Sequence, residues 1–130
     1  MVMVDSSVFI NFFNNIVNSE TYKLDELLQG GEVCIGDYIL AEVLQGIRND
    51  NQYGTVRKMM GAFDCFNILN KKLAIRSAEN YRLLRKRGVT VRKTVDVIIG
   101  TFCLENDLRL LHNDKDFKPL EKYLGLKTVN

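Results

Sequence analysis

The sequence predicts an α/β fold in which helices flank a mainly parallel sheet. Short apolar runs typical of strands alternate with longer segments of helical periodicity. Strands that alternate with helices are joined by right-handed crossovers, and such connections give a parallel sheet. A length of 130 residues suits one domain over residues 1–130, which is large enough to bury a core without disulfides or a structural metal.

Apolar runs bounded by polar residues or glycines predict the strands. These runs are Val2–Val4, Val33–Ile35, Phe66–Leu69 and Arg109–His112, with Leu126–Val129 as a candidate last strand. Helices are predicted over residues 8–13, 22–28, 56–63 and 95–104, after Asp37 to about Ile47, and from the cap Asn70 to Gly88. On the helix that begins after Asn70, we expect Ala74, Ala78 and Tyr81 to be buried.

Composition excludes several classes of protein. Cys34, Cys65 and Cys103 include no Cys-x-x-Cys pair and lie among apolar neighbours, which predicts reduced core residues in a reducing cytoplasm. The single histidine, His112, is close to none of them in sequence, which disfavours zinc. The apolar N-terminus contains an aspartate and follows no basic segment, so neither a signal peptide nor a membrane span is predicted. A net charge of +2 does not by itself indicate nucleic acid.

Acidic residues follow two of the predicted strands. Asp5 follows the first strand, and Asp114 with Asp116 follows the strand Arg109–His112. In open parallel sheets ligands bind beyond the carboxyl ends of the strands, where the strand order reverses. Each residue also has a simpler interpretation, as a turn or helix-capping aspartate.

Asp96 and Glu42 lie on predicted helices. The helix around Asp96 is apolar on every side, so it is expected to be buried, where a carboxylate is costly unless it is paired or binds a metal. Capping of its own helix is the alternative for Asp96. Glu42 points away from the stripe of Leu40, Val43 and Leu44, and this periodicity favours a solvated position.

Together these carboxylates predict a metal site. Four or five of them at one sheet edge would repel one another unless divalent cations neutralised them. Oxygen ligands without histidine favour Mg²⁺ or Mn²⁺ over zinc. Such a site suits phosphodiester hydrolysis.

The chain resembles the PIN-domain ribonucleases, in particular the VapC-type toxins of type II toxin–antitoxin systems. Four segments carry the resemblance, which extends over nearly the whole chain: Val4–Ile10, Leu40–Gly46, Thr94–Gly100 and Leu111–Phe117. It implies a three-layer α/β/α fold with a central parallel five-stranded sheet, Mg²⁺- or Mn²⁺-dependent endoribonuclease activity, and homodimerisation. It also implies a VapB-type antitoxin that occupies the site and forms a heterotetramer or larger assembly with the toxin.

The resemblance also assigns roles to single residues. Asp5 and Asp96 match the ligands of the principal metal, and Asp114 matches the fourth acidic position. Glu42 matches the glutamate that completes the cluster, which overrules the periodicity and implies that it faces a cleft. Asp116 matches a further acidic position, as a ligand or a neighbour of the ligands. Supporting roles fall to Ser6, Ser7 and Asn113, while His112 stands where many relatives have threonine.

Substrate contacts and rival functions remain open at this point. The densest basic run, a candidate RNA-binding surface, consists of Arg82, Arg85, Lys86, Arg87, Arg92 and Lys93. The alternative is a solvated helix end with cations near its C-terminus. One rival function is a catalytically silent PIN-fold module that binds RNA or protein. Another is a phosphatase with Asp5 as nucleophile, although Ser7 stands where haloacid-dehalogenase-type phosphatases have a second aspartate.

Overall fold

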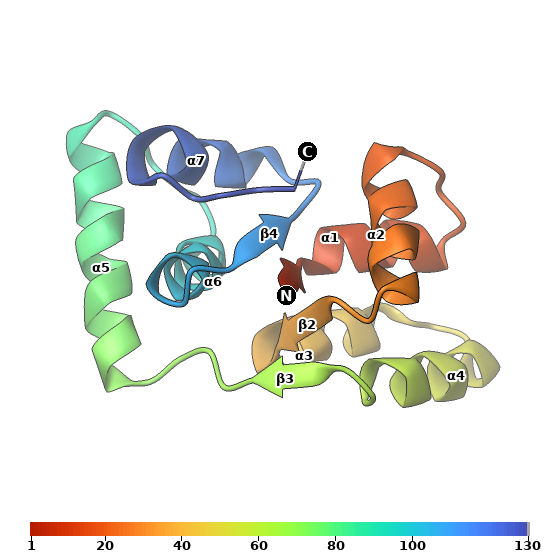
Figure 1. Ribbon diagram of the computed structural model, residues 1–130. Helices are drawn as coiled ribbons and strands as arrows, with labels where there is room; N and C mark the ends of the chain where they lie inside the picture. The colour runs from red at the N-terminus through yellow and green to blue at the C-terminus, as the bar shows by residue number, and fades with distance from the viewer. Residues whose placement is uncertain (130) are drawn as a thin grey trace.

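A parallel sheet runs through the centre of the protein, in a computed structural model that describes residues 1–129 (Figure 1). Its strands are β1 (Val2–Val4), β2 (Val33–Gly36), β3 (Asp64–Phe66) and β4 (Arg109–Leu111), in the order β3-β2-β1-β4. In register, Val2 of β1 pairs with Val33 on one side and with Arg109 on the other. All three residues of β1 are buried, as expected for a strand that is covered on both faces.

The helices form two groups on opposite sides of the sheet. The first group is α1 (Ser6–Phe13), α2 (Ser19–Gln29), α3 (Asp37–Gly46) and α4 (Asp50–Met60). The second is α5 (Lys71–Lys86), α6 (Thr94–Glu105) and α7 (Lys118–Leu124), with the short 3₁₀ helix η1 (Lys115–Phe117). The chain passes from β1 to β2 to β3 in one direction and then returns to β4 beyond β1. Right-handed crossovers in opposite directions place their helices on opposite faces (Figure 1).

The predicted three-layer α/β/α architecture is confirmed, but the predicted count of five strands is wrong. The part of the chain that the structure describes has a sheet of four strands. The candidate last strand, Leu126–Val129, contributes only an isolated parallel bridge between Leu110 and Thr128. Gly125 ends α7 in a left-handed conformation, and only two backbone hydrogen bonds then join the following residues to Leu110. The contact is too short to be a strand.

Helix α5 is rotated relative to the sequence prediction. Ala74 and Ala78 are exposed, and the buried positions are Leu73, Ser77, Asn80 and Leu84. This face packs on α6, where Asn80 Nδ2 donates a hydrogen bond of 3.0 Å to Thr101 Oγ1. Polar residues can be buried between α5 and α6 because the hydrogen bond compensates the cost of removing them from water.

The cysteine prediction is correct for two of the three residues. Cys34 and Cys103 are buried, but Cys65 is exposed because β3 is an edge strand whose three residues all reach solvent. No helix within residues 1–129 is both long and apolar enough to cross a membrane.

The strand order reverses between β1 and β4. The connections that leave these two neighbouring strands at their carboxyl ends lead to opposite faces of the sheet, which leaves space between them for a ligand. The backbone N–H of Asp5 donates to the carbonyl of Leu111 over 2.9 Å, so the two strand ends lie side by side. The acidic residues that follow β1 and β4 are thereby brought to one edge.

Candidate metal centre and active site

Asp5 stands between β1 and α1 and caps the helix. Its Oδ2 accepts hydrogen bonds from the backbone N–H of Ser7 at 3.1 Å and from Ser7 Oγ at 2.6 Å. The capping role that the sequence left open is therefore present. Asp5 is only 4% exposed, and this burial raises the pKa of its carboxyl despite the hydrogen bonds from Ser7.

Asp96 lies in the first turn of α6 and is 3% exposed. Its Oδ2 is buried and accepts no hydrogen bond from residues 1–129. The nearest cation is Lys93 Nζ, at 3.5 Å. The pKa of Asp96 is raised to about 7, mainly by burial and also by the charges of Asp5 and Asp114, while the charge of Lys93 acts in the opposite direction. Asp96 does not cap α6, because the cap residue is Lys93.

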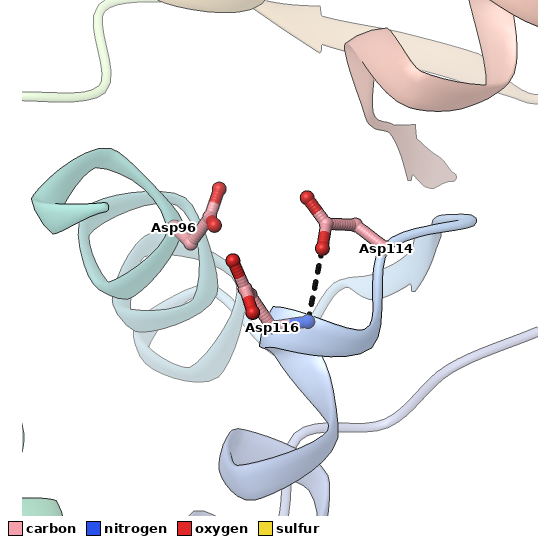
Figure 2. A group of neighbouring side chains, drawn as sticks. All are labelled: Asp96, Asp114 and Asp116. Atoms are coloured by element: carbon pink, nitrogen blue, oxygen red, sulfur yellow. Dashed lines mark hydrogen bonds between the residues drawn. The ribbon is translucent and has the colours of Figure 1, made fainter. Parts of the chain in front are cut away.

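Three carboxylates converge at this edge, as Figure 2 shows. One oxygen from each of Asp96, Asp114 and Asp116 lies within 4.8 Å of the other two. Asp114 caps η1, and its Oδ1 accepts the backbone N–H of Asp116 at 2.9 Å. Partial burial acts to raise the pKa of Asp114, but the hydrogen bonds from Lys93 and from the Asp116 amide hold it below its ordinary value.

Glu42 borders the same cluster from α3. It is half-buried, and its carboxylate accepts a hydrogen bond of 3.1 Å from Ser6 Oγ at the start of α1. Burial raises the pKa of Glu42, and the charges of Asp5 and Asp114 raise it as well. The periodicity of α3 alone favoured a solvated position. The hydrogen bond from Ser6, the neighbour of Asp5 in the chain, places Glu42 beside the cluster instead.

The five predicted acidic residues thus form an inner group and two neighbours. Asp96, Asp114 and Asp116 make up the inner group, and Asp5 and Glu42 lie outside it. Ser7 links the two parts, because its Oγ donates to Asp5 and accepts the backbone N–H of Asn113 at 3.1 Å. The contact of Asn113 with this link is made by its backbone.

Lys93 belongs to the acidic cluster, a placement that the sequence analysis missed. Its Nζ donates to Asp114 Oδ2 at 2.8 Å and lies near Asp96, which raises the pKa of the lysine well above its ordinary value. The three-residue spacing from Lys93 to Asp96, a separation at which helical side chains meet, was the available signal. The rest of the predicted basic surface is exposed: Arg82, Arg85, Lys86, Arg87 and Arg92.

The donor set fits a hard divalent cation. All of the available ligand atoms are carboxylate oxygens, the type that Mg²⁺ and Mn²⁺ prefer. Within residues 1–129, the buried Asp96 Oδ2 has no hydrogen bond and only the ion pair with Lys93 at 3.5 Å, so a bound cation would compensate its loss of water. The pKa values of three carboxyl groups here, those of Asp5, Glu42 and Asp96, are raised, although Lys93 places a positive charge beside Asp96 and Asp114.

The fold and the acidic edge define a class of protein, and comparison with known families agrees. The family model described as "PIN domain" matches residues 2–123. The chain therefore belongs to the PIN domain family, which confirms the resemblance noted in the sequence.

Three relatives show how far the likeness extends. The "VapC ribonuclease Mb1587" of Mycobacterium bovis is 23% identical over 133 residues, covering 100% of this chain and 98% of that protein. The structure of VapBC2 from Rickettsia felis bound to a promoter DNA fragment matches with a TM-score of 0.77 at 17% identity, over 100% of this chain and 98% of the other. A toxin–antitoxin complex from Klebsiella pneumoniae matches with a TM-score of 0.71 at 20% identity, over 100% and 97%.

Proposed function

We propose that this protein is a Mg²⁺- or Mn²⁺-dependent endoribonuclease and the toxin of a type II toxin–antitoxin pair. The observation that carries the proposal is the convergence of Asp96, Asp114 and Asp116 next to Asp5 and Glu42. The name of the curated VapC relative supports RNA as the substrate. The oxygen-only donor set supports the choice of cation.

In this proposal each side chain has a stated task. Asp5, Asp96, Glu42 and Asp114 hold the cation, and Asp116 is a further ligand or a neighbour that orients Asp114. Bound divalent cations lower the pKa of water and stabilise charge on a phosphate. Hydroxyl groups support the ligands: Ser6 orients Glu42, and Ser7 orients Asp5.

The exposed basic residues near the end of α5 suit the phosphates of RNA. Arg82, Arg85, Lys86 and Arg87 lie on the last turns of α5 and just after it, and Arg92 precedes α6. Their positive charge attracts a polyanion without reading its sequence. We therefore expect binding by this surface to weaken steeply with salt and to vary little with base sequence.

The structural relatives suggest the partners. One is described as VapBC2 bound to a fragment of promoter DNA, and another as a toxin–antitoxin complex. We propose that this chain forms a homodimer in the cytoplasm and that a VapB-type antitoxin covers the acidic cluster, in a heterotetramer or larger assembly. Co-expression with the product of the adjacent gene, followed by size-exclusion chromatography and light scattering, tests this arrangement. A chain that stays free of that product would contradict it.

The test of the activity is RNA cleavage by the purified protein. We expect structured RNA to be cut with Mg²⁺ or Mn²⁺ and not with chelator. Asp5→Asn and Asp96→Asn should each lower the rate by at least about 100-fold, since each removes a charge at the metal site. Asp107→Asn is the matched control, because Asp107 is exposed in a left-handed conformation that asparagine also adopts.

Each other outcome identifies a different function. Cleavage with chelator present, or full activity in Asp96→Asn, contradicts a metal-dependent nuclease. Binding of RNA without cleavage under all metal conditions indicates a silent PIN-fold module. Turnover of a small phosphate ester that only Asp5→Asn abolishes indicates a phosphatase.

A further inference from the structure

His112, the one histidine of the sequence, contacts both the helix α7 and the loop after β4 that carries Asp114. His112 directly follows β4, and its side chain is 8% exposed. Its Nε2 lies 2.9 Å from Glu121 Oε2 on α7, and its Nδ1 accepts the backbone N–H of Asp114 at 3.2 Å. The ring also packs on Phe117, with 4.8 Å between the ring centroids. One imidazole therefore joins α7 to the backbone of a cluster residue.

These contacts select one protonation pattern for the ring. A backbone N–H can only donate, so the Nδ1 atom that faces Asp114 has to carry a lone pair. The proton of the neutral ring then sits on Nε2, where it is donated to the Glu121 carboxylate. Glu121 is itself held, because its Oε1 accepts a hydrogen bond of 3.3 Å from Thr128 Oγ1. The ring is thus fixed in its rotation as well as in its tautomer.

The backbone of Asp114 determines where two of the three inner carboxylates lie. Asp114 Oδ1 accepts the N–H of Asp116 and starts η1, and Asp114 Oδ2 faces Lys93. A rotation of this peptide would move both Asp114 and Asp116 away from Asp96, which α6 holds independently. The hydrogen bond to His112 Nδ1 acts against that rotation.

We propose that His112, held by Glu121, is a positioning residue that fixes the Asp114 peptide so that the inner carboxylates converge on one divalent cation. This inference rests on the metal site of the proposed function, but not on cleavage of RNA. Groups that orient metal ligands change metal affinity by about 10- to 100-fold when they are removed. Plain packing of the ring on Phe117 would predict no such change.

The first experiment observes the tautomer. In ¹⁵N-labelled, tag-free protein the only histidine ring signals come from His112, so a long-range ¹H–¹⁵N spectrum at pH 8 without metal reads its two nitrogens directly. We expect an unprotonated Nδ1 and a protonated Nε2 in one fixed form. A proton on Nδ1, or rapid exchange between the two tautomers, would overturn the proposal.

The second experiment measures Mn²⁺ affinity from the electron paramagnetic resonance signal of free Mn²⁺. His112→Phe keeps an aromatic ring against Phe117 but has no acceptor for Asp114, and we expect it to weaken Mn²⁺ binding by about 10-fold. His112→Asn places a carbonyl oxygen near the position of Nδ1, so it should restore most of the affinity. Equal affinity in wild type and His112→Phe, or no rescue by asparagine, would contradict the proposal.

A variant on α7 covers the case in which His112→Phe fails to fold by circular dichroism. Glu121→Met leaves the imidazole in place but removes the acceptor of its Nε2 proton. We expect a loss of Mn²⁺ affinity of a few-fold and a mixture of tautomers. Unchanged affinity together with an unchanged ring spectrum would refute the role given to Glu121 and, with it, the proposal.

The outcomes separate this inference from the proposed function. A fixed tautomer and a Mn²⁺ affinity that depends on His112, in a protein that cuts no RNA, would overturn the nuclease and support the positioning role. If the protein cleaves RNA in a metal-dependent way but its Mn²⁺ affinity does not change when His112 is substituted, the nuclease is supported and the positioning role is overturned.

Discussion

Asp96 is a residue that lowers the stability of the metal-free protein at the pH at which a cation would bind it. Its carboxyl is buried in the first turn of α6, and burial raises its pKa to about 7. A chain without a cation therefore folds at a cost near neutral pH, because folding must either bury the charge of Asp96 or restore a proton that the unfolded chain has released. Such a cost is typical of functional sites, which keep groups that a purely structural core would replace.

The pH dependence of stability follows from this shift. The folded chain holds the proton of Asp96 up to about pH 7, whereas the unfolded chain releases it near the ordinary value of 3.8. The stability contributed by the neutral form is complete below pH 3.8 and is lost as the pH rises through 7. We expect metal-free protein to lose about 2 kcal/mol from pH 5.5 to pH 8 in urea titrations.

Asp96→Asn provides the check on that assignment. An amide cannot ionise, so the variant should be more stable than wild type at pH 8 in chelator, by about 1–3 kcal/mol, and its stability should vary less with pH. Asp107→Asn should keep the wild-type profile, since that side chain is exposed. A profile of Asp96→Asn as steep as that of wild type would assign the titration to another group.

The ammonium group of Lys93 competes with a metal ion for the carboxylates of the cluster. Its Nζ contacts Asp114 and lies near Asp96, so a cation has to compete with it. We expect Lys93→Met to strengthen Mn²⁺ binding by up to about fivefold, because the lysine side chain is half exposed and such pairs contribute about 1 kcal/mol or less. The measurement is Mn²⁺ titration calorimetry.

The neighbouring Arg92 is the control for this effect. Arg92→Met removes the same charge one residue away, from a side chain that makes no ion pair within residues 1–129. An equal gain in both variants would show a general electrostatic effect and no direct competition by Lys93.

At the level of elements, Gly100 allows α6 to pack closely against α7. Gly100 stands one turn after Asp96 and is buried against Leu120 of α7 and Leu126. A methyl group at Gly100 would overlap the Leu120 side chain, which is fully buried. The absence of a side chain therefore brings α7, and with it Glu121, close to the cluster.

Two glycine substitutions with opposite expected signs test this packing. Gly100→Ala should lower the free energy of unfolding by about 1–3 kcal/mol, because Leu120 has to leave its position in a filled core. Gly54→Ala, within the exposed part of α4, meets no atom and should raise stability by about 0.5–1 kcal/mol through helix propensity. Thermal melts of both variants measure the contrast. A neutral Gly100→Ala would show that α7 is loosely packed.

The elements also show what the sequence could predict. Asp5 and Asp114 were predictable because Asp5 directly follows a strand, Asp114 lies in the loop after another, and chain direction in a parallel sheet determines which edge they reach. Asp96 was predictable from the all-apolar helix around it. These inferences need only local patterns, so they do not depend on the detailed packing.

The features that local patterns did not predict concern the way elements meet. The buried face of α5 was misjudged because Ser77 and Asn80 look like surface residues until Thr101 on α6 supplies a partner. Glu42 was assigned to the cluster by family resemblance, since the contact with Ser6 comes from another helix. Lys93 was grouped with the candidate RNA-binding residues, because a basic run does not show which of its side chains contacts the aspartates.

For the whole molecule, the cluster joins the two halves of the chain. Asp5 and Glu42 come from the part with α1–α4, while Asp96, Asp114 and Asp116 come from the part with α5–α7 (Figure 1). A cation held by members of both groups would bind the folded state and not the unfolded one. Metal binding is therefore expected to stabilise the fold.

Thermal denaturation tests that expectation. Mn²⁺ at about 100 times its dissociation constant should add about 2.7 kcal/mol and raise Tm by on the order of 10 °C. The rise should disappear with chelator and in Asp96→Asn, and it should remain in Asp107→Asn. A Tm that does not change when Mn²⁺ is added would contradict a metal site in the folded protein.

The pairing of β1 with β4 also has a consequence for biosynthesis. The partner of Val2 is Arg109, so β1 cannot complete its pairing until β4, more than 100 residues later in the chain, has been synthesised. Asp114 and Asp116 emerge later still. A nascent or truncated chain that ends before these two aspartates therefore lacks the assembled cluster, however well the part with α1–α4 has folded.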